Sequence, residues 1–257
     1  MAGTTDFHRT CIAAVVLGAI TVTVPALAAS PCSFEVQGEG RVGAVIDART
    51  FRMDDGREVR LAGIETLTDG GAALGALVAG RNVTLRGETD APDRYGRQPA
   101  FVFVERAETP VQSRLLAEGN ALASGAVADK ACAAELAAGE AAARRARRGI
   151  WADSAAIKNA ESPDDILARI GHFTVIEGKV LSVRQAGATT YVNFGRRWTR
   201  DFAVTISRRV MPAFEAAGIS VKSLENKRIR VRGWIEARGG PRIEALRVEQ
   251  IEMAGEN

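Results

Sequence analysis

The 257-residue chain is 46% hydrophobic and 25% charged, and its formal net charge is +3. This length and hydrophobic content suffice for the cores of one or two domains. Neither a long charge run nor a low-complexity tract indicates disorder. The composition therefore excludes a largely disordered chain and favours one or two folded domains.

The first 29 residues have the layout of a secretory signal peptide. A short head with Arg9 precedes an apolar run from Cys11 to Val24, and the small residues Ala28 and Ala29 provide a cleavage site. The apolar run is shorter than the roughly 20 residues that a membrane span needs. We therefore expect a periplasmic or secreted protein with no membrane span after cleavage.

Cleavage of this leader would leave two cysteines and one histidine. An even cysteine pair in an oxidising compartment favours a disulfide over a catalytic thiol or a metal site, so Cys32 and Cys132 are expected to be bonded. The single remaining histidine, His172, excludes a mechanism built on paired histidines and a histidine-rich zinc site. Any catalysis would depend on carboxylates, arginines and a metal.

Residues 33–152 place strands first and helices afterwards, which is an α+β order. Hydrophobic alternation predicts strand segments at residues 38–50, 51–64, 81–86 and 100–104. Apolar and capping patterns predict helices at residues 69–79, 109–119 and 129–149. Asp55-Gly56 indicates a type I′ hairpin turn within the second strand segment, and Asp129 is the expected cap of the last helix.

The predicted hairpin brings its two ends to the same rim of a small sheet. Asp47 and Thr50 lie at one end, and Glu65 and Thr66 lie at the other. Clustered carboxylates at a sheet rim are ligands for metals that prefer oxygen. The rim is therefore the candidate metal or catalytic site of this domain.

Residues 153–161 are polar and unpatterned and are interpreted as a linker, which continues through a short helix to residue 170. Beyond it, the apolar period returns to two. The expected elements are strands at residues 175–183, 190–194 and 202–206, a helix at 208–217, and strands at 227–235 and 243–251. Three strands, a helix and two strands is the order of an OB-fold, so residues 171–254 are predicted to form a small OB-like barrel.

Charge is divided unevenly between the two predicted domains. Residues 33–152 contain 16 Lys and Arg against 17 Asp and Glu, whereas residues 153–257 contain 17 against 13. An excess of basic side chains favours a polyanionic partner such as nucleic acid. The sequence therefore points to the second domain as the more basic binding module.

Three motifs of the first domain resemble those of the staphylococcal nuclease (thermonuclease) family. Residues 47–50 stand where that family has Asp-Gly-Asp-Thr, and residues 60–68 stand where it has Arg-Leu-x-Gly-Ile-Asp-x-Pro-Glu. Residues 93–97 read Asp-Arg-Tyr-Gly-Arg, which is the third family motif in full. The resemblance covers about residues 38–151 and implies a five-stranded OB-like barrel with three helices.

Enzymes of this family cleave phosphodiesters with a bound calcium ion, a glutamate that activates water, and two arginines that stabilise the charged transition state. The resemblance makes Arg60 and Arg97 the phosphate arginines, although both could instead be structural ion-pair residues. It places Asp47, Glu65 and Thr66 at the metal. Calcium is expected only if the domain is an active enzyme, and no cofactor is expected otherwise.

Several residues depart from the family pattern at this rim. Arg49 replaces an aspartate that binds the metal, Leu67 replaces the proline, and Thr68 replaces the general-base glutamate. A cation at position 49 repels calcium and can pair with Asp47 or Glu65 instead. A threonine hydroxyl is far too weak a base to take a proton from water. These changes predict a catalytically impaired domain.

Three functions are consistent with the sequence. The favoured one is an exported nuclease-like protein that has lost catalysis and binds single-stranded nucleic acid or another polyanion. The first alternative is an active metal-dependent nuclease whose site is rearranged around Glu65 and Asp47. The second alternative is a structural envelope protein whose two domains make protein contacts.

The fourth strand of the second domain carries a candidate nucleic-acid-binding face. Alternation places Arg228, Arg230, Arg232 and Trp234 on one side of that strand. Three guanidinium groups in line can follow a phosphate backbone, and an indole can stack on a base. Three arginines and a tryptophan after the second strand are expected to extend this face: Arg196, Arg197, Arg200 and Trp198. The alternative is a solvated exterior.

Overall fold

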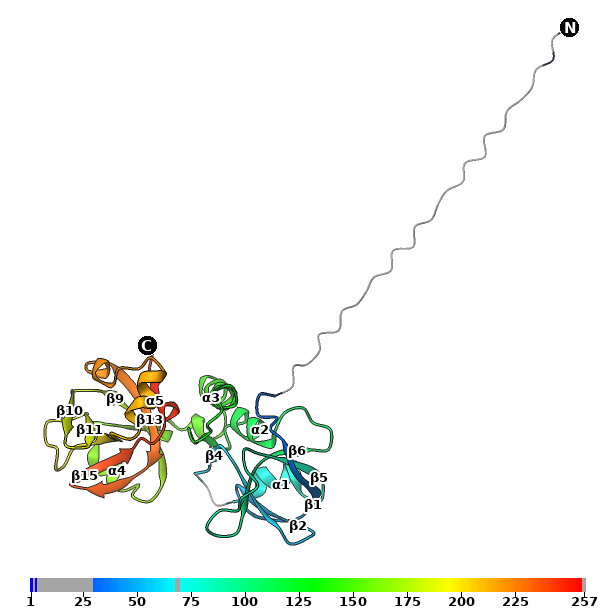
Figure 1. Ribbon diagram of the computed structural model, residues 1–257, viewed down its shortest axis with the longest axis horizontal. Helices are drawn as coiled ribbons and strands as arrows, with labels where there is room; N and C mark the ends of the chain where they lie inside the picture. Colours follow the sequence, from blue (N-terminus) through cyan, green and yellow to red (C-terminus); the bar gives the residue numbers. More distant parts are fainter. Residues whose placement is uncertain (2, 4–29, 68–69, 256–257) are drawn as a thin grey trace.

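The computed structural model of the chain describes residues 1, 3, 30–67 and 70–255 (Figure 1). Apart from residues 1 and 3, the expected signal peptide lies outside the described residues, and so does Thr68. Within those ranges, no helix combines the length and apolar character needed to cross a membrane. The described chain has a mixed α+β composition, as the sequence predicts.

The first domain is built on a closed barrel of five strands in the order β1-β2-β3-β6-β5. Their bounds are β1 Val36–Asp47, β2 Thr50–Met53, β3 Glu58–Leu61, β5 Asn82–Arg86 and β6 Gln98–Val104. The first strand pairs antiparallel with β2 and β5, and β3 pairs parallel with β6. Apolar side chains that alternate along the strands, such as Phe51, Leu61 and Leu85, are buried inside the barrel.

The helices of this domain are α1 Ala72–Val78, α2 Val111–Ala117 and α3 Lys130–Arg145, followed by a 3₁₀ turn at Gly149–Ala152. The Asp129 side chain accepts a hydrogen bond from the Cys132 N–H at 2.8 Å, which is the predicted cap of α3. A short pair of strands, β4 Ile64–Glu65 and β7 Leu122–Ala123, joins the barrel to the helices. The candidate rim therefore lies where the barrel meets the helical layer.

The turn between β2 and β3 differs from the predicted type I′ turn. That turn needs a positive φ at both central residues, whereas of Asp55 and Gly56 only Gly56, at +89°, has one. The Met53 N–H donates to the Arg57 carbonyl at 2.9 Å, so three residues form the loop. Glycine fits because it adopts the left-handed conformation without steric cost.

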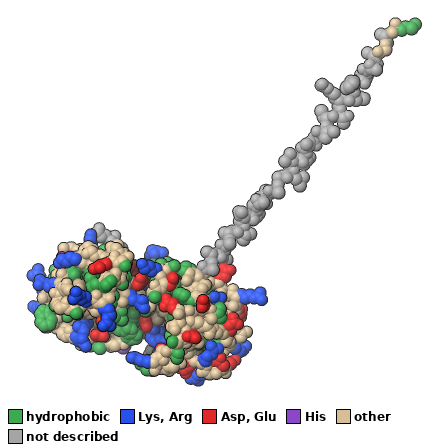
Figure 2. All heavy atoms as spheres, in the orientation of Figure 1, with side chains coloured by type: hydrophobic (Ala, Val, Ile, Leu, Met, Phe, Trp, Pro, Cys, Tyr) green, Lys and Arg blue, Asp and Glu red, His purple; other side chains and the backbone are tan. Residues whose placement is uncertain are grey.

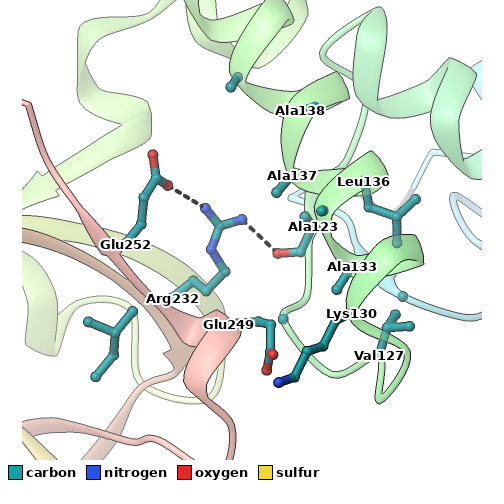
Figure 3. Close-up of a pocket in the computed structure, with 15 residues that line it drawn as sticks. Ala123, Val127, Lys130, Ala133, Leu136, Ala137, Ala138, Arg232, Glu249 and Glu252 are labelled. Atoms are coloured by element: carbon teal, nitrogen blue, oxygen red, sulfur yellow. Dashed lines mark hydrogen bonds and ion pairs between the residues drawn. The ribbon is translucent and has the colours of Figure 1, made fainter. Parts of the chain in front are cut away.

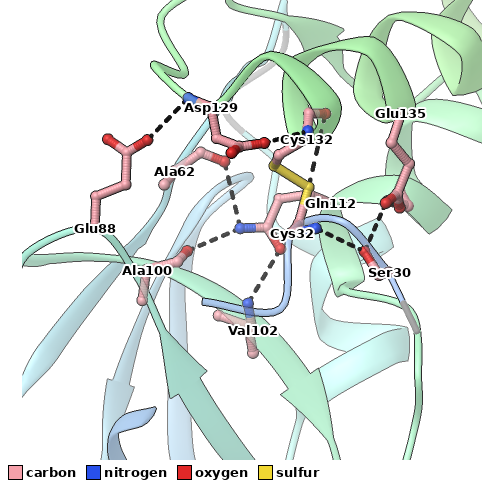
Figure 4. The surroundings of a disulfide bond; sticks show 11 residues. Ser30, Cys32, Ala62, Glu88, Ala100, Val102, Gln112, Asp129, Cys132 and Glu135 are labelled. Carbon is pink, nitrogen blue, oxygen red and sulfur yellow. Dashed lines mark hydrogen bonds between the residues drawn. A yellow bond between two sulfur atoms is a disulfide. The ribbon is translucent and has the colours of Figure 1, made fainter. Parts of the chain in front are cut away.

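The predicted disulfide between Cys32 and Cys132 is confirmed (Figure 4). Both cysteines are fully buried, and their Cα atoms are 4.7 Å apart. Beside the bond, the Ser30 hydroxyl donates to the Glu135 carboxylate at 2.6 Å. The bond and this contact fasten the segment before β1 to α3.

The second domain consists of two sheets. One has the order β10-β11-β12-β15-β14, and the other has the order β16-β13-β9-β8. The strand bounds are β8 Ile157–Asn159, β9 Phe173–Lys179, β10 Ser182–Ala186, β11 Thr189–Asn193, β12 Ala203–Ser207, β13 Arg228–Trp234, β14 Glu236–Arg238, β15 Gly240–Glu244 and β16 Ile251–Met253. Two helices accompany them, α4 Pro163–Leu167 and α5 Met211–Ala216, with 3₁₀ turns at Ser154–Ala156, Val221–Leu224 and Val248–Gln250.

Two strand pairings are common to both domains. In the second domain, β9 pairs antiparallel with β13 and β12 pairs parallel with β15. The first domain has the equivalent pairs, β1 with β5 and β3 with β6. The second domain differs from the expected single barrel because its strands are divided between two sheets.

The segment predicted as a linker contains β8, which pairs parallel with β9. The prediction is wrong there because a three-residue strand with one apolar side chain, Ile157, shows no alternation to detect. An apolar cluster also joins the two domains, and it contains Leu122, Ala143 and Trp151 from the first with Phe173 and Val175 from the second. The two domains therefore pack directly against each other.

Candidate functional site

The barrel rim brings Asp47, Arg49 and Glu65 together. Asp47 ends β1, Glu65 lies in β4, and Arg49 occupies the turn before β2. The Asp47 carboxylate accepts the Arg49 backbone N–H at 2.8 Å, an interaction that fixes the turn. The Arg49 guanidinium forms an ion pair with Glu65 and donates to the Ile64 carbonyl at 3.2 Å.

This arrangement occupies the carboxylates that a metal would need. The side chains of Arg49 and Glu65 are only 11% and 14% exposed, so their ion pair is largely shielded from water. Burial raises the pKa of Glu65, and the Arg49 charge opposes that rise. In the part of the chain that the structure describes, no three His, Cys, Asp or Glu side chains are grouped to hold a metal ion. The described residues of the rim, with the Glu65 carboxylate paired to Arg49, do not fit a calcium ion.

The two rim threonines are placed differently. Thr50 is buried, and its hydroxyl has no hydrogen-bond partner among the described residues. Thr66 follows β4 and is partly exposed. Thr50 therefore lies in the barrel wall, whereas Thr66 lies at the edge of the rim.

Arg60 lies on β3 directly opposite Thr50 of β2. Its side chain is partly exposed. Within the described ranges, no ion pair involves Arg60, whereas the neighbouring Arg52 pairs with Glu58 at 2.8 Å. Of the two predicted phosphate arginines, Arg60 is the one that forms no ion pair among the described residues.

Arg97 contacts other residues of its own motif. Its Nε and Nη2 atoms donate to one Asp93 oxygen at 2.9 and 2.7 Å, and Tyr95 stacks against its guanidinium at 4.8 Å. Partial burial opposes ionisation of Asp93, but the hydrogen bonds from Arg97 and Tyr95 outweigh it and lower the pKa of that carboxyl. The motif at residues 93–97 is thus a closed loop held by its own side chains.

The arginine row on β13 is engaged by carboxylates. Glu177 accepts from Arg228 at 2.7 Å and from Arg230 at 2.6 Å. Glu252 accepts from Arg230 at 2.9 Å and from Arg232 at 3.2 Å. The expectation of an open row of guanidinium groups is therefore wrong, because glutamates of β9 and β16 neutralise it on both sides.

Arg232 crosses from the second domain to the first (Figure 3). Its guanidinium lies 2.8 Å from the Glu140 carboxylate of α3 and donates to the Ala123 carbonyl at 3.0 Å. Glu140 is completely buried and Arg232 is 3% exposed. Beside them, a cleft of about 420 Å³ separates α3 from the second domain. The third arginine of the row thus joins the domains and cannot contact a ligand in solution.

The two exposed tryptophans belong to different sheets of the second domain, Trp234 to the strand β13 and Trp198 to a loop beside the five-stranded sheet. Trp234 is half-exposed on β13 and contacts Phe173 edge to face, with ring centroids 6.0 Å apart. Trp198 is 77% exposed in the connection between β11 and β12. Arg196 and Trp198 therefore line the five-stranded sheet and do not extend the row on β13.

The carboxylates that face the arginine row are not predicted from the sequence. Glu140 and Arg144 are spaced i and i+4 on α3 and form an ion pair at 3.1 Å. A glutamate among alanines on a helix that also carries Cys132 is the signal that could have marked this position as buried. The long-range partner, Arg232, has no comparable signal.

Residues 70–153 match a family model described as "Staphylococcal nuclease homologue". The matched region includes the motif at 93–97 and begins after the rim segment that carries Arg49 and Glu65. No curated protein matches the chain. The first domain is therefore similar, over residues 70–153, to the staphylococcal nuclease homologue family, in agreement with the resemblance of its motifs.

Proposed function

We propose that this protein is an exported, nuclease-like protein that does not cleave phosphodiesters and instead binds nucleic acid. The main support for a loss of catalysis is the shielded ion pair between Arg49 and Glu65. It places a positive charge where the family's chemistry needs a divalent cation. The carboxylate that would bind the cation is already neutralised.

The rim cannot regain a calcium site by a small movement. Hard cations take six to eight oxygen ligands, with carboxylates supplying most of the charge. Freeing Glu65 would leave the Arg49 guanidinium without its partner in a poorly hydrated position, which costs several kcal/mol. The resemblance also places Thr68 at the position of the general base, so the site lacks a group that can take a proton from water.

Nucleic-acid binding is supported by the similarity to nuclease homologues and by the distribution of charge. Arg60 is available at the rim, and Lys and Arg side chains are spread over the second domain (Figure 2). Binding that relies on phosphate contacts weakens with salt because it releases counterions. The protein should therefore bind single-stranded DNA with a clear salt dependence.

The test is incubation of purified mature protein with labelled single-stranded DNA, with and without calcium. The expected result is retention of the DNA with no cleavage above background. Calcium-stimulated cleavage that Arg60→Gln abolishes and Arg52→Gln leaves intact would support an active nuclease. If the protein neither binds nor cleaves the DNA at low salt, that result would favour a structural envelope protein.

A further inference from the structure

The outward face of the five-stranded sheet in the second domain carries an aligned set of polar side chains. Val183, Val192 and Val204 point into the core of the domain. On the opposite face, Arg184 lies directly across from Tyr191, and Tyr191 lies across from Thr205. These three side chains therefore form a continuous line across β10, β11 and β12.

Two loops lie beside this line, at the end of the sheet where the parallel strands β12 and β15 begin. The connection between β11 and β12 contributes Arg196 and Trp198, and the β14–β15 hairpin contributes Arg238. The loops touch at Gly240, where an added Cβ would lie 2.6 Å from the Asp201 carbonyl oxygen, so only glycine fits there. Together the sheet and the loops enclose a groove of about 780 Å³.

The charge of the groove is positive. Its charged lining residues are four arginines and one aspartate, namely Arg184, Arg196, Arg238, Arg242 and Asp201. The Asp201 carboxylate accepts the Arg197 backbone N–H at 2.8 Å, so it stabilises the loop. Arg242 lies 3.6 Å from Glu236, whereas Arg184, Arg196 and Arg238 have no ion pair within the described ranges. These three exposed arginines suit a ligand that carries several negative charges.

The aromatic residues of the groove define the ligand further. Trp198 is 77% exposed, and Tyr191 is partly exposed in the middle of the sheet. Aromatic side chains beside a positively charged track are the arrangement that stacks unpaired bases. A duplex keeps its bases stacked inside, so it could not use these rings. The combination favours a single strand over a duplex.

We propose that this groove binds a single-stranded nucleic acid segment, with phosphates on Arg184, Arg196 and Arg238 and a base stacked on Trp198. The inference rests on the proposed function and assigns it to a specific surface. The row on β13 cannot serve instead, because Glu177, Glu252 and Glu140 occupy its guanidinium groups.

The first test titrates the full mature protein into a fluorescein-labelled oligothymidylate of 15 nucleotides. The fluorescence anisotropy of the label gives the Kd at several salt concentrations. Loss of one stacked base weakens binding by about 5- to 150-fold, so Trp198→Ala should raise the Kd by a factor in this range. Trp234→Ala, which changes the exposed tryptophan of the other sheet, is the matched control and should leave the Kd unchanged.

Salt dependence tests the arginines separately from stacking. Each phosphate contact contributes about 0.7 to the log–log slope for a single strand. The triple change Arg184→Gln, Arg196→Gln and Arg238→Gln should therefore flatten the slope by about 2. The control, with Arg106→Gln, Lys179→Gln and Arg209→Gln, removes three exposed charges outside the groove and should leave the slope nearly unchanged. Far-UV circular dichroism establishes that both variants are folded.

Tryptophan emission reports the stacking directly. In a Trp234→Phe background, the oligonucleotide should quench the exposed indole of Trp198, since the third tryptophan, Trp151, is buried. Wild-type binding that neither Trp198→Ala nor the triple change weakens would overturn the groove assignment while leaving the proposed function intact. Equal binding of a duplex, insensitive to Trp198→Ala, would also overturn it. No binding by the wild type would defeat both proposals.

Discussion

Replacement of Arg232 by methionine should destabilise the whole protein. The change removes a guanidinium that is 3% exposed and leaves the fully buried Glu140 without its partner across the domain interface. Removal of one member of a buried ion pair typically costs about 3–5 kcal/mol. In the variant, Glu140 still accepts the Ala123 N–H at 2.7 Å and still pairs with Arg144 at 3.1 Å. Because these contacts partly compensate the buried charge, we expect a loss at the low end of this range, about 3 kcal/mol.

The measurement is urea unfolding followed by tryptophan fluorescence and far-UV circular dichroism, with the midpoint and slope fitted together. The double variant Arg232→Met with Glu140→Gln should be more stable than Arg232→Met alone. A neutral glutamine needs no counter-charge, and its carbonyl oxygen can still accept the Ala123 N–H. The difference between the single and double variants measures the cost of the unpaired charge.

Arg228→Met is the control, because the Arg228 side chain is 53% exposed in its pair with Glu177. Exposed pairs contribute about 0–1 kcal/mol, so its loss should be small. A loss below about 1 kcal/mol for Arg232→Met would refute the buried-pair reasoning. Equal losses for the single and double variants would do the same.

Three further outcomes are expected. Cys32→Ser with Cys132→Ser opens a loop of sequence separation 100 and should cost about 4–5 kcal/mol in the chain-entropy model, measured by calorimetry; two free thiols in the native wild type would contradict the bond. Burial opposes ionisation of Glu177, but hydrogen bonds from Arg228 and Arg230 outweigh it and lower its pKa below the ordinary 4.5. Its stabilising contribution is thus full above pH 4.5 and is lost as pH falls through the lowered value, so Glu177→Gln should flatten the acid limb of the stability curve. Asp129→Ala removes the cap of α3 and should cost about 1 kcal/mol by thermal unfolding, whereas no change would show that the cap is replaced by water.

Local patterns account for much of the first domain. Alternation locates strands such as β3 and β5, which have one buried face, whereas β6 is buried on both faces and reads as a continuous apolar run. The cap at Asp129 marks the start of α3. The disulfide was predictable from the even number of cysteines and from the oxidising compartment that the leader pattern predicts. The turn at Gly56 was assigned to the wrong type because Asp-Gly serves both two-residue and three-residue loops, and flanking hydrogen bonds decide between them.

Tertiary packing explains what the sequence could not predict. Alternation places Arg228, Arg230 and Arg232 on one face of β13, but it cannot show that Glu140 of α3, in the other domain, pairs with Arg232. The strand β8 was missed because its partner, β9, lies more than ten residues further along the chain and its own pattern is too short. The pairing of Arg49 with Glu65 was foreseeable, since both residues belong to motifs whose spacing brings them to one rim.

Calorimetric titration with calcium tests the central claim most directly. The wild type should show no calcium binding, because Arg49 neutralises Glu65 and repels the cation. The variant Arg49→Asp with Thr68→Glu restores the carboxylates that the family places there and should bind calcium. Saturable binding of calcium by the wild type, lost in Glu65→Gln, would contradict the account and return the protein to the metal-dependent nucleases.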